Sequence, residues 1–126
     1  MSDMIHKLSC LGKTWIFDID GTIVKHNGYK EDGYDTLLKG AAEFMNSLPK
    51  EDVIILMTSR KENVKKPTIE FLKKNRIRFD EIIFNLPYGE RILINDRKLS
   101  RLNTAIAINT NRDKFMEDKF EIDYEL

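Results

Sequence analysis

The feature that most constrains this chain is a short apolar run, Trp15–Phe17, that leads directly into two aspartates one residue apart. In a strand, residues i and i+2 point to the same side, so Asp18 and Asp20 converge on one point. Two carboxylates this close repel each other unless a cation lies between them or one of them stays protonated. Mg²⁺ prefers oxygen ligands and satisfies the pair most simply, and Gly21 permits a tight turn after the strand. The stretch therefore predicts a buried strand that ends at an oxygen-rich site.

Asp18-Ile19-Asp20-Gly21-Thr22 resembles the DxDGT signature of the haloacid dehalogenase superfamily, a large group dominated by phosphatases. The resemblance implies that Asp18 is the nucleophile, which forms an aspartyl-phosphate, and that Asp20 is the general acid and base. Covalent catalysis divides one difficult displacement into two easier steps, and a metal ion neutralises the phosphoryl oxygens. A DxD pair after a strand also occurs as a turn that caps a helix and as the metal clamp of glycosyltransferases, for which this chain is short.

Composition narrows the classes of protein that the chain can belong to. Its 126 residues fit one domain, and 21 basic residues balance 21 acidic ones, which argues against a general nucleic-acid binder. No apolar stretch approaches the roughly 20 residues that span a bilayer, and the N-terminus lacks the pattern of a signal peptide. Cys10 is the single cysteine, so no internal disulfide can form. We therefore expect a cytoplasmic protein without a membrane span, and association into a homo-oligomer stays open.

Apolar runs alternate with helical patterns along the middle of the chain. Runs of this kind indicate strands buried on both faces of a parallel sheet. The expected strands cover residues 13–18, 53–57, 81–84, 91–94 and 104–108. Helical spacing predicts helices over 35–48, with Asp35 as N-cap, and over 63–75. The glycine-containing stretch 23–34 is predicted to be a loop beside the site, and its candidates for substrate contact are Lys25, His26, Tyr29 and Lys30.

Together these patterns predict an α/β fold, a Rossmann-like parallel sheet of about five strands with helices on both faces. The resemblance covers residues 13–110 and implies the strand order 5-4-1-2-3, with no cap domain because both usual insertion points are short. Residues 1–12 would form an N-terminal segment and residues 111–126 a C-terminal tail. The expected site lies at the carboxyl ends of the strands, where open α/β sheets bind ligands.

The resemblance extends to two later motifs and fails at one. A strand that ends in Thr58, with Ser59 beside it, matches the family's phosphate-binding motif, and Asp96 matches the acidic residue that completes the Mg²⁺ site with Asp18 and the backbone carbonyl of Asp20. Many small members carry Lys-Pro between these motifs, where this chain has Leu86-Pro87. Lys66 and Arg91 are the preferred replacements for that lysine, with Lys65 and Lys98 as further candidates.

The substrate expected from these features is a phosphorylated small molecule or a glycan precursor rather than nucleic acid. Residues 92–98 and 104–109 are similar to those of small bacterial phosphatases of capsule or surface-polysaccharide synthesis. A catalytically weak or inactive domain that binds phosphorylated ligands is the alternative, because the Lys-Pro motif is absent. A response-regulator receiver domain has a similar length, but its acceptor aspartate follows the third strand, where this chain has no acidic residue directly at the strand end.

Overall fold

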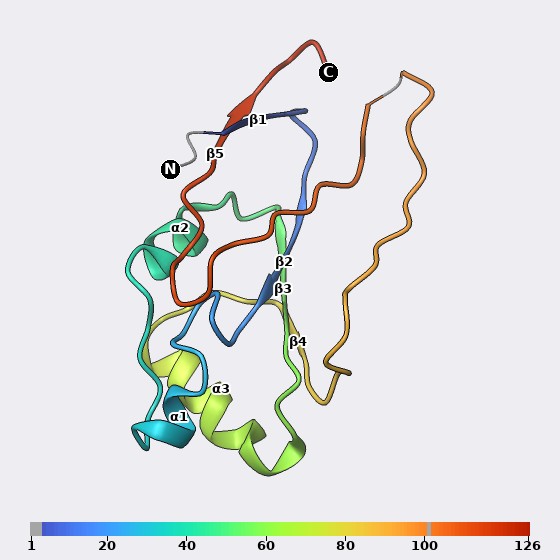
Figure 1. Ribbon diagram of the computed structural model, residues 1–126. Coiled ribbons are helices and arrows are strands. Elements are labelled where there is room, and N and C mark those ends of the chain that lie inside the picture. Colours follow the sequence, from blue (N-terminus) through green and yellow to red (C-terminus); the bar gives the residue numbers. More distant parts are fainter. Residues whose placement is uncertain (1–3, 101) are drawn as a thin grey trace. The chain divides into compact units, whose positions relative to one another are not determined.

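The computed structural model describes residues 4–100 and 102–126, which divide into two compact units (Figure 1). The larger unit contains residues 12–88 together with 110–116. The smaller unit contains the remaining described residues, 4–11, 89–100, 102–109 and 117–126. The architecture is mixed α/β, with one small parallel sheet in each unit. Among the described residues, no helix has the length and apolar character needed to cross a bilayer.

The sheet of the larger unit has three parallel strands in the order β2-β3-β4. They are β2 (Thr14–Asp18), β3 (Val53–Met57) and β4 (Glu81–Ile83), close to three of the predicted strands. Asp18 lies opposite Met57, and Met57 lies opposite Ile83, so the three strands end at the same level. The residues that follow these strands are therefore brought together at one edge of the sheet.

A buried carboxylate fixes how β2 begins against β3. Asp52, which directly precedes β3 and is 4% exposed, accepts hydrogen bonds from the Lys13 backbone N–H (3.1 Å) and the Trp15 indole (2.9 Å). Both donors lie at the start of β2, so one side chain sets the register of the two strands. The same register carries Asp18 to the far end of β2, level with the end of β3.

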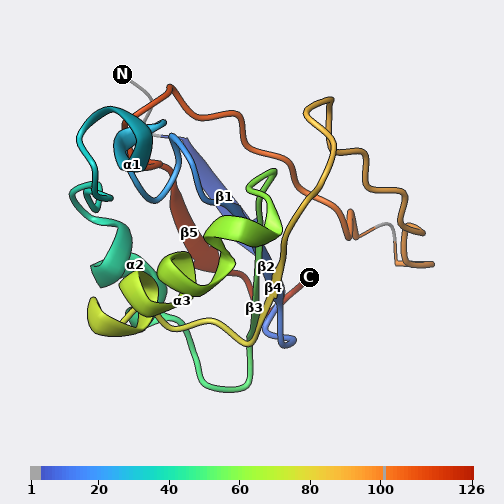
Figure 2. The same ribbon diagram turned by 90° about the horizontal axis from the view of Figure 1, so that it is seen from below.

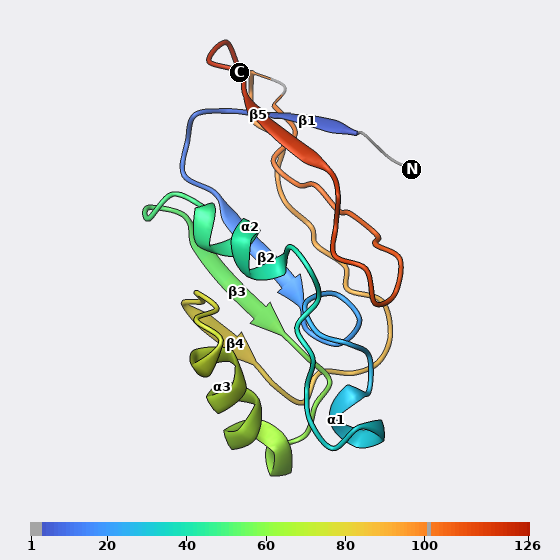
Figure 3. The same ribbon diagram turned by 90° about the vertical axis from the view of Figure 1, so that its left-hand side faces the viewer.

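Helices α2 (Ala41–Ser47) and α3 (Lys65–Lys74) lie on the same face of this sheet (Figures 2 and 3). A one-turn helix, α1 (Gly28–Glu31), and a 3₁₀ turn, η1 (Glu62–Val64), complete the unit. The prediction of helices on both faces is wrong for the described residues of this unit. Both β–α–β connections step in one direction along the sheet, and right-handed crossovers then place their helices on one face. Apolar side chains between sheet and helices form the core.

Helix α2 begins six residues later than predicted, at Ala41 instead of Asp35. Gly40 has a φ of 92°, a left-handed conformation that helix interiors exclude. Asp35 does not cap a helix, because its side chain binds Arg60. Leu37 and Leu38, which belong to the predicted helix, pack against the core from the connecting segment.

The smaller unit contains a two-stranded parallel sheet that the sequence did not predict, formed by β1 (Ile5–Leu8) and β5 (Lys119–Ile122). His6 stacks on Phe120 with ring centroids 5.1 Å apart, and its Nε2 lies 2.8 Å from Asp118. The Lys7 ammonium lies 2.7 Å from Glu121 and has a raised pKa, through its hydrogen bond and attraction to that carboxylate. Residues from the two ends of the chain thus pair through complementary side chains.

Residues 91–94 and 104–108 are not strands in the structure, and the five strands of the described residues form two sheets rather than a clear single sheet in the predicted order. The apolar run is there, but Ile92 and Ile94 are 82% and 90% exposed. A strand satisfies its backbone N–H and C=O groups through a neighbour, so an apolar sequence alone does not create one. Polar contacts join the residues that follow the first run to the start of the second. The Asn95 side chain donates to the Thr104 hydroxyl at 2.9 Å, and that hydroxyl donates to the Asp96 carbonyl.

Candidate functional site

The turn after β2 holds the first predicted site residues in place. The carbonyl of Ile19 accepts hydrogen bonds from three successive backbone N–H groups, those of residues 22–24. This tight turn requires the positive φ of Gly21 (81°). At its entrance, the Thr22 hydroxyl donates to Asp18 Oδ2 at 3.2 Å. Asp18 is thereby held at the carboxyl end of the sheet, half-buried, with its carboxylate beside the turn.

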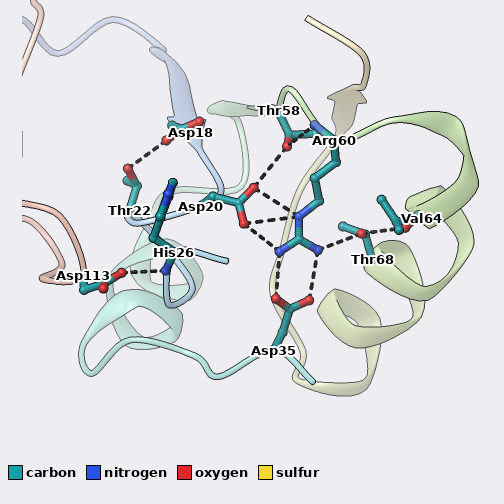
Figure 4. Close-up of polar contacts among 10 residues, drawn as sticks. All are labelled: Asp18, Asp20, Thr22, His26, Asp35, Thr58, Arg60, Val64, Thr68 and Asp113. Carbon is teal, nitrogen blue, oxygen red and sulfur yellow. Dashed lines mark hydrogen bonds and ion pairs between the residues drawn. The ribbon is translucent and has the colours of Figure 1, made fainter. Parts of the chain in front are cut away.

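Asp20 points toward a buried guanidinium that the sequence patterns did not single out (Figure 4). Arg60 Nη2 donates to Asp20 Oδ1 at 2.8 Å, and Nε donates to Oδ1 and Oδ2 at 3.3 and 3.1 Å. From the other side, Asp35 accepts from Nη1 at 3.0 Å and from Nη2 at 2.7 Å. The Arg60 side chain is 2% exposed, against 20% for Asp20 and 7% for Asp35. One arginine therefore joins two carboxylates from different loops.

Two further contacts fix this guanidinium. Nη1 also donates to the Thr68 hydroxyl at 2.9 Å, and that hydroxyl donates to the Val64 carbonyl of the preceding turn. The Tyr29 ring lies over the guanidinium, 4.1 Å from its carbon to the ring centroid. Burial by itself lowers the pKa of Arg60, but the hydrogen bonds and attraction to Asp35 and Asp20 outweigh it and raise that pKa above its ordinary value. Arg60 is therefore a permanently charged, immobile centre.

The predicted phosphate-binding hydroxyls follow β3, next to this centre. Thr58 is 1% exposed, and its hydroxyl accepts from the Arg60 backbone N–H at 3.0 Å and lies 3.5 Å from Asp20 Oδ2. Ser59 instead donates to the Pro87 carbonyl at 3.2 Å. The Thr58 hydroxyl thus lies beside Asp20, whereas the Ser59 hydroxyl is turned toward the loop that carries Leu86-Pro87.

The loop candidates differ in their surroundings. Tyr29 contacts Arg60 through its ring, whereas Lys25 forms an exposed ion pair with Asp32 at 2.9 Å. That hydrogen bond raises the pKa of Lys25. The Lys30 ammonium lies 5.7 Å from the Tyr29 ring centroid. Of these three candidates, Tyr29 therefore has the closest contact with the carboxylate site.

Residues 110–116 form a strap across the same turn, although the sequence patterns place most of them in the C-terminal tail. The Asp113 N–H donates to the Gly21 carbonyl at 2.8 Å, and its carboxylate accepts from the His26 backbone N–H at 2.6 Å. Phe115 anchors the strap in the core, 7% exposed and 5.7 Å from Phe44 between ring centroids. The stem of Arg112 lies over Gly21, since a Cβ added there would be 3.3 Å from the arginine Cγ.

The donor chemistry of this edge fits a hard cation such as Mg²⁺. The carbonyl oxygen of Asp20 accepts no hydrogen bond from the described residues, although the carbonyls on either side of it do. Asp18, Asp20, Asp35 and Arg60 together carry a formal charge of −2 at neutral pH. Within the described residues, no group of three acidic, histidine or cysteine side chains is arranged around one point.

The remaining predicted residues lie elsewhere. Lys66 is exposed near the start of α3, two residues before Thr68, and lines a shallow depression with Glu62, Lys65 and Ile69. Two residues correspond to about 200° of helix rotation, so Lys66 faces away from the Arg60 contact. Arg91 and Asp96 are exposed residues of the smaller unit.

The sequence contained partial signals for the residues that were missed. Arg60 directly follows the Thr58-Ser59 motif, and a buried arginine needs carboxylate partners. Asp35 is such a partner, although its place before an apolar helical pattern favours a helix cap. No local pattern connects Asp113 with Gly21, because 92 residues separate them.

Comparison of the chain with family models, with curated proteins and with solved structures finds no match. The site is therefore interpreted from its own geometry and from the sequence motif.

Proposed function

We propose that this protein is a Mg²⁺-dependent phosphomonoesterase that acts through an aspartyl-phosphate. The observation that carries the proposal is the convergence of Asp18, Asp20 and Thr58 at the carboxyl edge of one parallel sheet. A nucleophile, a proton donor and a hydroxyl donor are the groups that phosphoryl transfer to a carboxylate requires. The DxDGT motif assigns the same two aspartates to this chemistry.

In the proposed reaction, an Asp18 oxygen attacks phosphorus, and the bond from phosphorus to the ester oxygen breaks. Asp20 gives its proton to the departing oxygen, so the alcohol leaves neutral. Asp20 then takes a proton from water as the water oxygen attacks phosphorus, which breaks the bond to Asp18 and releases phosphate. Thr58 donates a hydrogen bond to a phosphoryl oxygen, and Ser59 is the second proposed hydroxyl. At the end, Asp18 is again an ionised carboxylate and Asp20 again carries a proton, so the cycle balances.

The proposal includes Mg²⁺ bound by Asp18, the free carbonyl of Asp20 and Asp96 of the smaller unit. The cation would supply positive charge for the phosphoryl oxygens. We propose the finer architecture that brings Asp96 to this position: residues 91–94 join the edge of β2, residues 104–108 lie beyond them, and the order becomes 5-4-1-2-3. The support is that β2 is an edge strand of its sheet and that Asp96 follows the apolar run as Asp18 follows β2.

The proposed substrate is a phosphorylated small molecule or glycan precursor in the cytoplasm. Support comes from the zero formal net charge, which gives no general attraction for nucleic acid, and from the single exposed cysteine, Cys10. The segments between β2 and β4 hold short helices and loops but no inserted domain. Such a site is open to bulky substrates, and a second subunit is one means of covering it.

The test is phosphate release from an aryl phosphate and a panel of sugar phosphates, with Mg²⁺ and with EDTA. We expect Mg²⁺-dependent release that falls by at least about 10³-fold in Asp18→Asn, because the nucleophile is lost. Asp32→Asn is the matched control, since it removes a loop carboxylate that pairs with Lys25 outside the site. Release that persists unchanged in Asp18→Asn would sink the mechanism.

One observation favours a second candidate, a domain that binds phosphorylated ligands without turnover. Leu86 occupies the place where many family members carry the lysine of the third motif, and its N–H is bonded to the Thr58 carbonyl at 3.1 Å. An apolar residue there supplies no charge for the phosphoryl group. Binding of phosphorylated compounds, measured by calorimetry, without release from any of them would establish this candidate instead.

A further inference from the structure

We propose that Arg60 is a positioning residue, which fixes the orientation of the Asp20 carboxylate for the chemical step. This inference rests on the proposed phosphatase function and deepens it. Its basis is the juxtaposition in Figure 4 of one buried guanidinium and two carboxylates from separate loops. It assigns Arg60 and Asp35 a role in the chemical step without contact with the substrate.

The hydrogen-bond geometry distinguishes the two oxygens of Asp20. Oδ1 accepts from Arg60 Nη2 at 2.8 Å and from Nε at 3.3 Å. Oδ2 has a 3.1 Å contact with Nε and a long 3.5 Å contact with the Thr58 hydroxyl. The guanidinium therefore holds both oxygens of Asp20, Oδ1 through two nitrogens and Oδ2 through one. These contacts with two guanidine nitrogens oppose rotation of the Asp20 carboxylate, so its orientation is fixed.

A second carboxylate holds the guanidinium from the other side. Here the same guanidinium makes two contacts with Asp35, so its charge is shared between two acids. The trio has a formal charge of −1, so carboxylates on two sides compensate the buried guanidinium.

Arg60 is not arranged to bind the phosphoryl group itself. Its side chain is 2% exposed, and all three guanidine nitrogens already donate to Asp20, Asp35 or Thr68. The Tyr29 ring covers its face. A phosphate would have to displace a carboxylate to reach it, which would leave that carboxylate unpaired beside a buried charge. Fixed geometry at Asp20 is the role that remains.

Leaving-group dependence tests this role. Asp20 assists an alkyl phosphate, whose alkoxide is a poor leaving group, far more than a nitrophenyl phosphate, whose phenolate departs without a proton. We expect Arg60→Lys, which keeps the charge but not the paired geometry, to lower kcat for an alkyl phosphate about 10²-fold and for nitrophenyl phosphate less than about tenfold. Asp20→Asn should show the same selectivity with larger losses.

Arg78→Lys is the matched control, because Arg78 also forms several hydrogen bonds, which include those to the carbonyls of Leu48 and Pro49. Arg78 precedes β4, whereas the site follows the carboxyl ends of the strands. We expect it to leave both rates unchanged. Equal losses on the two substrates in Arg60→Lys, or no loss, would overturn the inference while the phosphatase stands. A wild type that releases no phosphate overturns both.

Thr68→Val keeps the experiment decisive if circular dichroism shows that Arg60→Lys does not fold. It removes one anchor of Arg60, the 2.9 Å contact, without changing any charge. We expect a several-fold loss confined to the alkyl phosphate. A loss that is equal for both substrates would mean that the cluster only stabilises the fold and would overturn the inference.

Discussion

The stretches 12–88 and 89–109 contain similar apolar runs, yet only the first converts them into strands. Ile54, within β3, is fully buried between neighbours on both sides of its strand. Ile94 belongs to an equally apolar run and is 90% exposed. The difference lies in what surrounds each run. β3 has Asp52 to fix its register and two helices to cover its face, whereas the described part of 89–109 contains neither a helix nor a paired strand.

This contrast shows that an apolar run acquires structure from its partners. In the larger unit, the site residues inherit their positions from strands that end together, and Arg60 then joins the loops that follow them. In the stretch 89–109, the polar contacts between Asn95 and Thr104 close a loop without fixing a backbone ladder. Within the larger unit, the site residues therefore take their geometry from strand ends that are fixed by their partners.

The largest expected effect comes from replacing one leucine by alanine in each region and comparing the loss of stability. Leu72→Ala removes a fully buried side chain from α3 and should lower the free energy of unfolding by about 2–5 kcal/mol. Leu99→Ala removes a side chain that is fully exposed and should change it by less than about 0.5 kcal/mol. Urea denaturation followed by circular dichroism measures both. A similar cost for the two variants would show that Leu99 is buried in the folded protein and would break the comparison.

The sequence predicted the strands and the helix whose packing partners are adjacent along the chain, joined by β–α–β connections. β2, β3, β4 and α3 agree within a few residues, because unbroken apolar runs and helical spacing are sufficient when a β–α–β connection brings the strands together. It missed β1 and β5, which are only four residues long and pair across the full chain. It placed the start of α2 too early, because aspartate is a common helix N-cap but the side chain of Asp35 is bound by Arg60.

The same distinction applies to the candidate site. Asp18, Asp20 and Thr58 were predicted from motifs that sit at strand ends, and the structure brings them to one edge. Arg60 and Asp113 were missed because their partners lie 40 and 87 residues away in the sequence. Such pairings depend on loop conformation, which hydrophobic patterns do not encode.

A crosslink tests whether residues 91–94 adopt the proposed place beside β2. In a Cys10→Ser background, we expect Ile16→Cys with Ile94→Cys to form a disulfide in most molecules, because alignment of Asp96 with Asp18 places these positions opposite each other. Neighbouring strands lie about 4.8 Å apart, within the Cα separations that a disulfide spans. Ile16→Cys with Ile106→Cys is the control, since a strand one position further out, at about 10 Å, is too distant.

Mass spectrometry after mild oxidation, with Mg²⁺ present and with EDTA, measures both crosslinks. Crosslinking of the control pair instead of the first pair would contradict the strand order 5-4-1-2-3. If neither pair forms, residues 91–94 do not dock on β2, and Asp96 loses its proposed place in the metal site.

The smallest expected effect is a change in KM, which tests which basic residue takes the place of the lysine missing from the Leu86-Pro87 motif. The guanidinium of Arg112 has no ion-pair or hydrogen-bond partner among the described residues, and its stem lies over Gly21, the residue after Asp20. We expect Arg112→Gln to raise KM for a phosphate ester roughly tenfold, about 1.4 kcal/mol, because a charged hydrogen bond to the phosphoryl group is lost. Lys66→Gln, with the same loss of charge from the outer side of α3, should change KM by less than about twofold.

Steady-state kinetics, with inorganic phosphate as a competitive inhibitor, measures both variants. The opposite ranking would mean that α3 rather than the strap supplies the cation, and that the region around Lys66 turns toward the substrate when it binds.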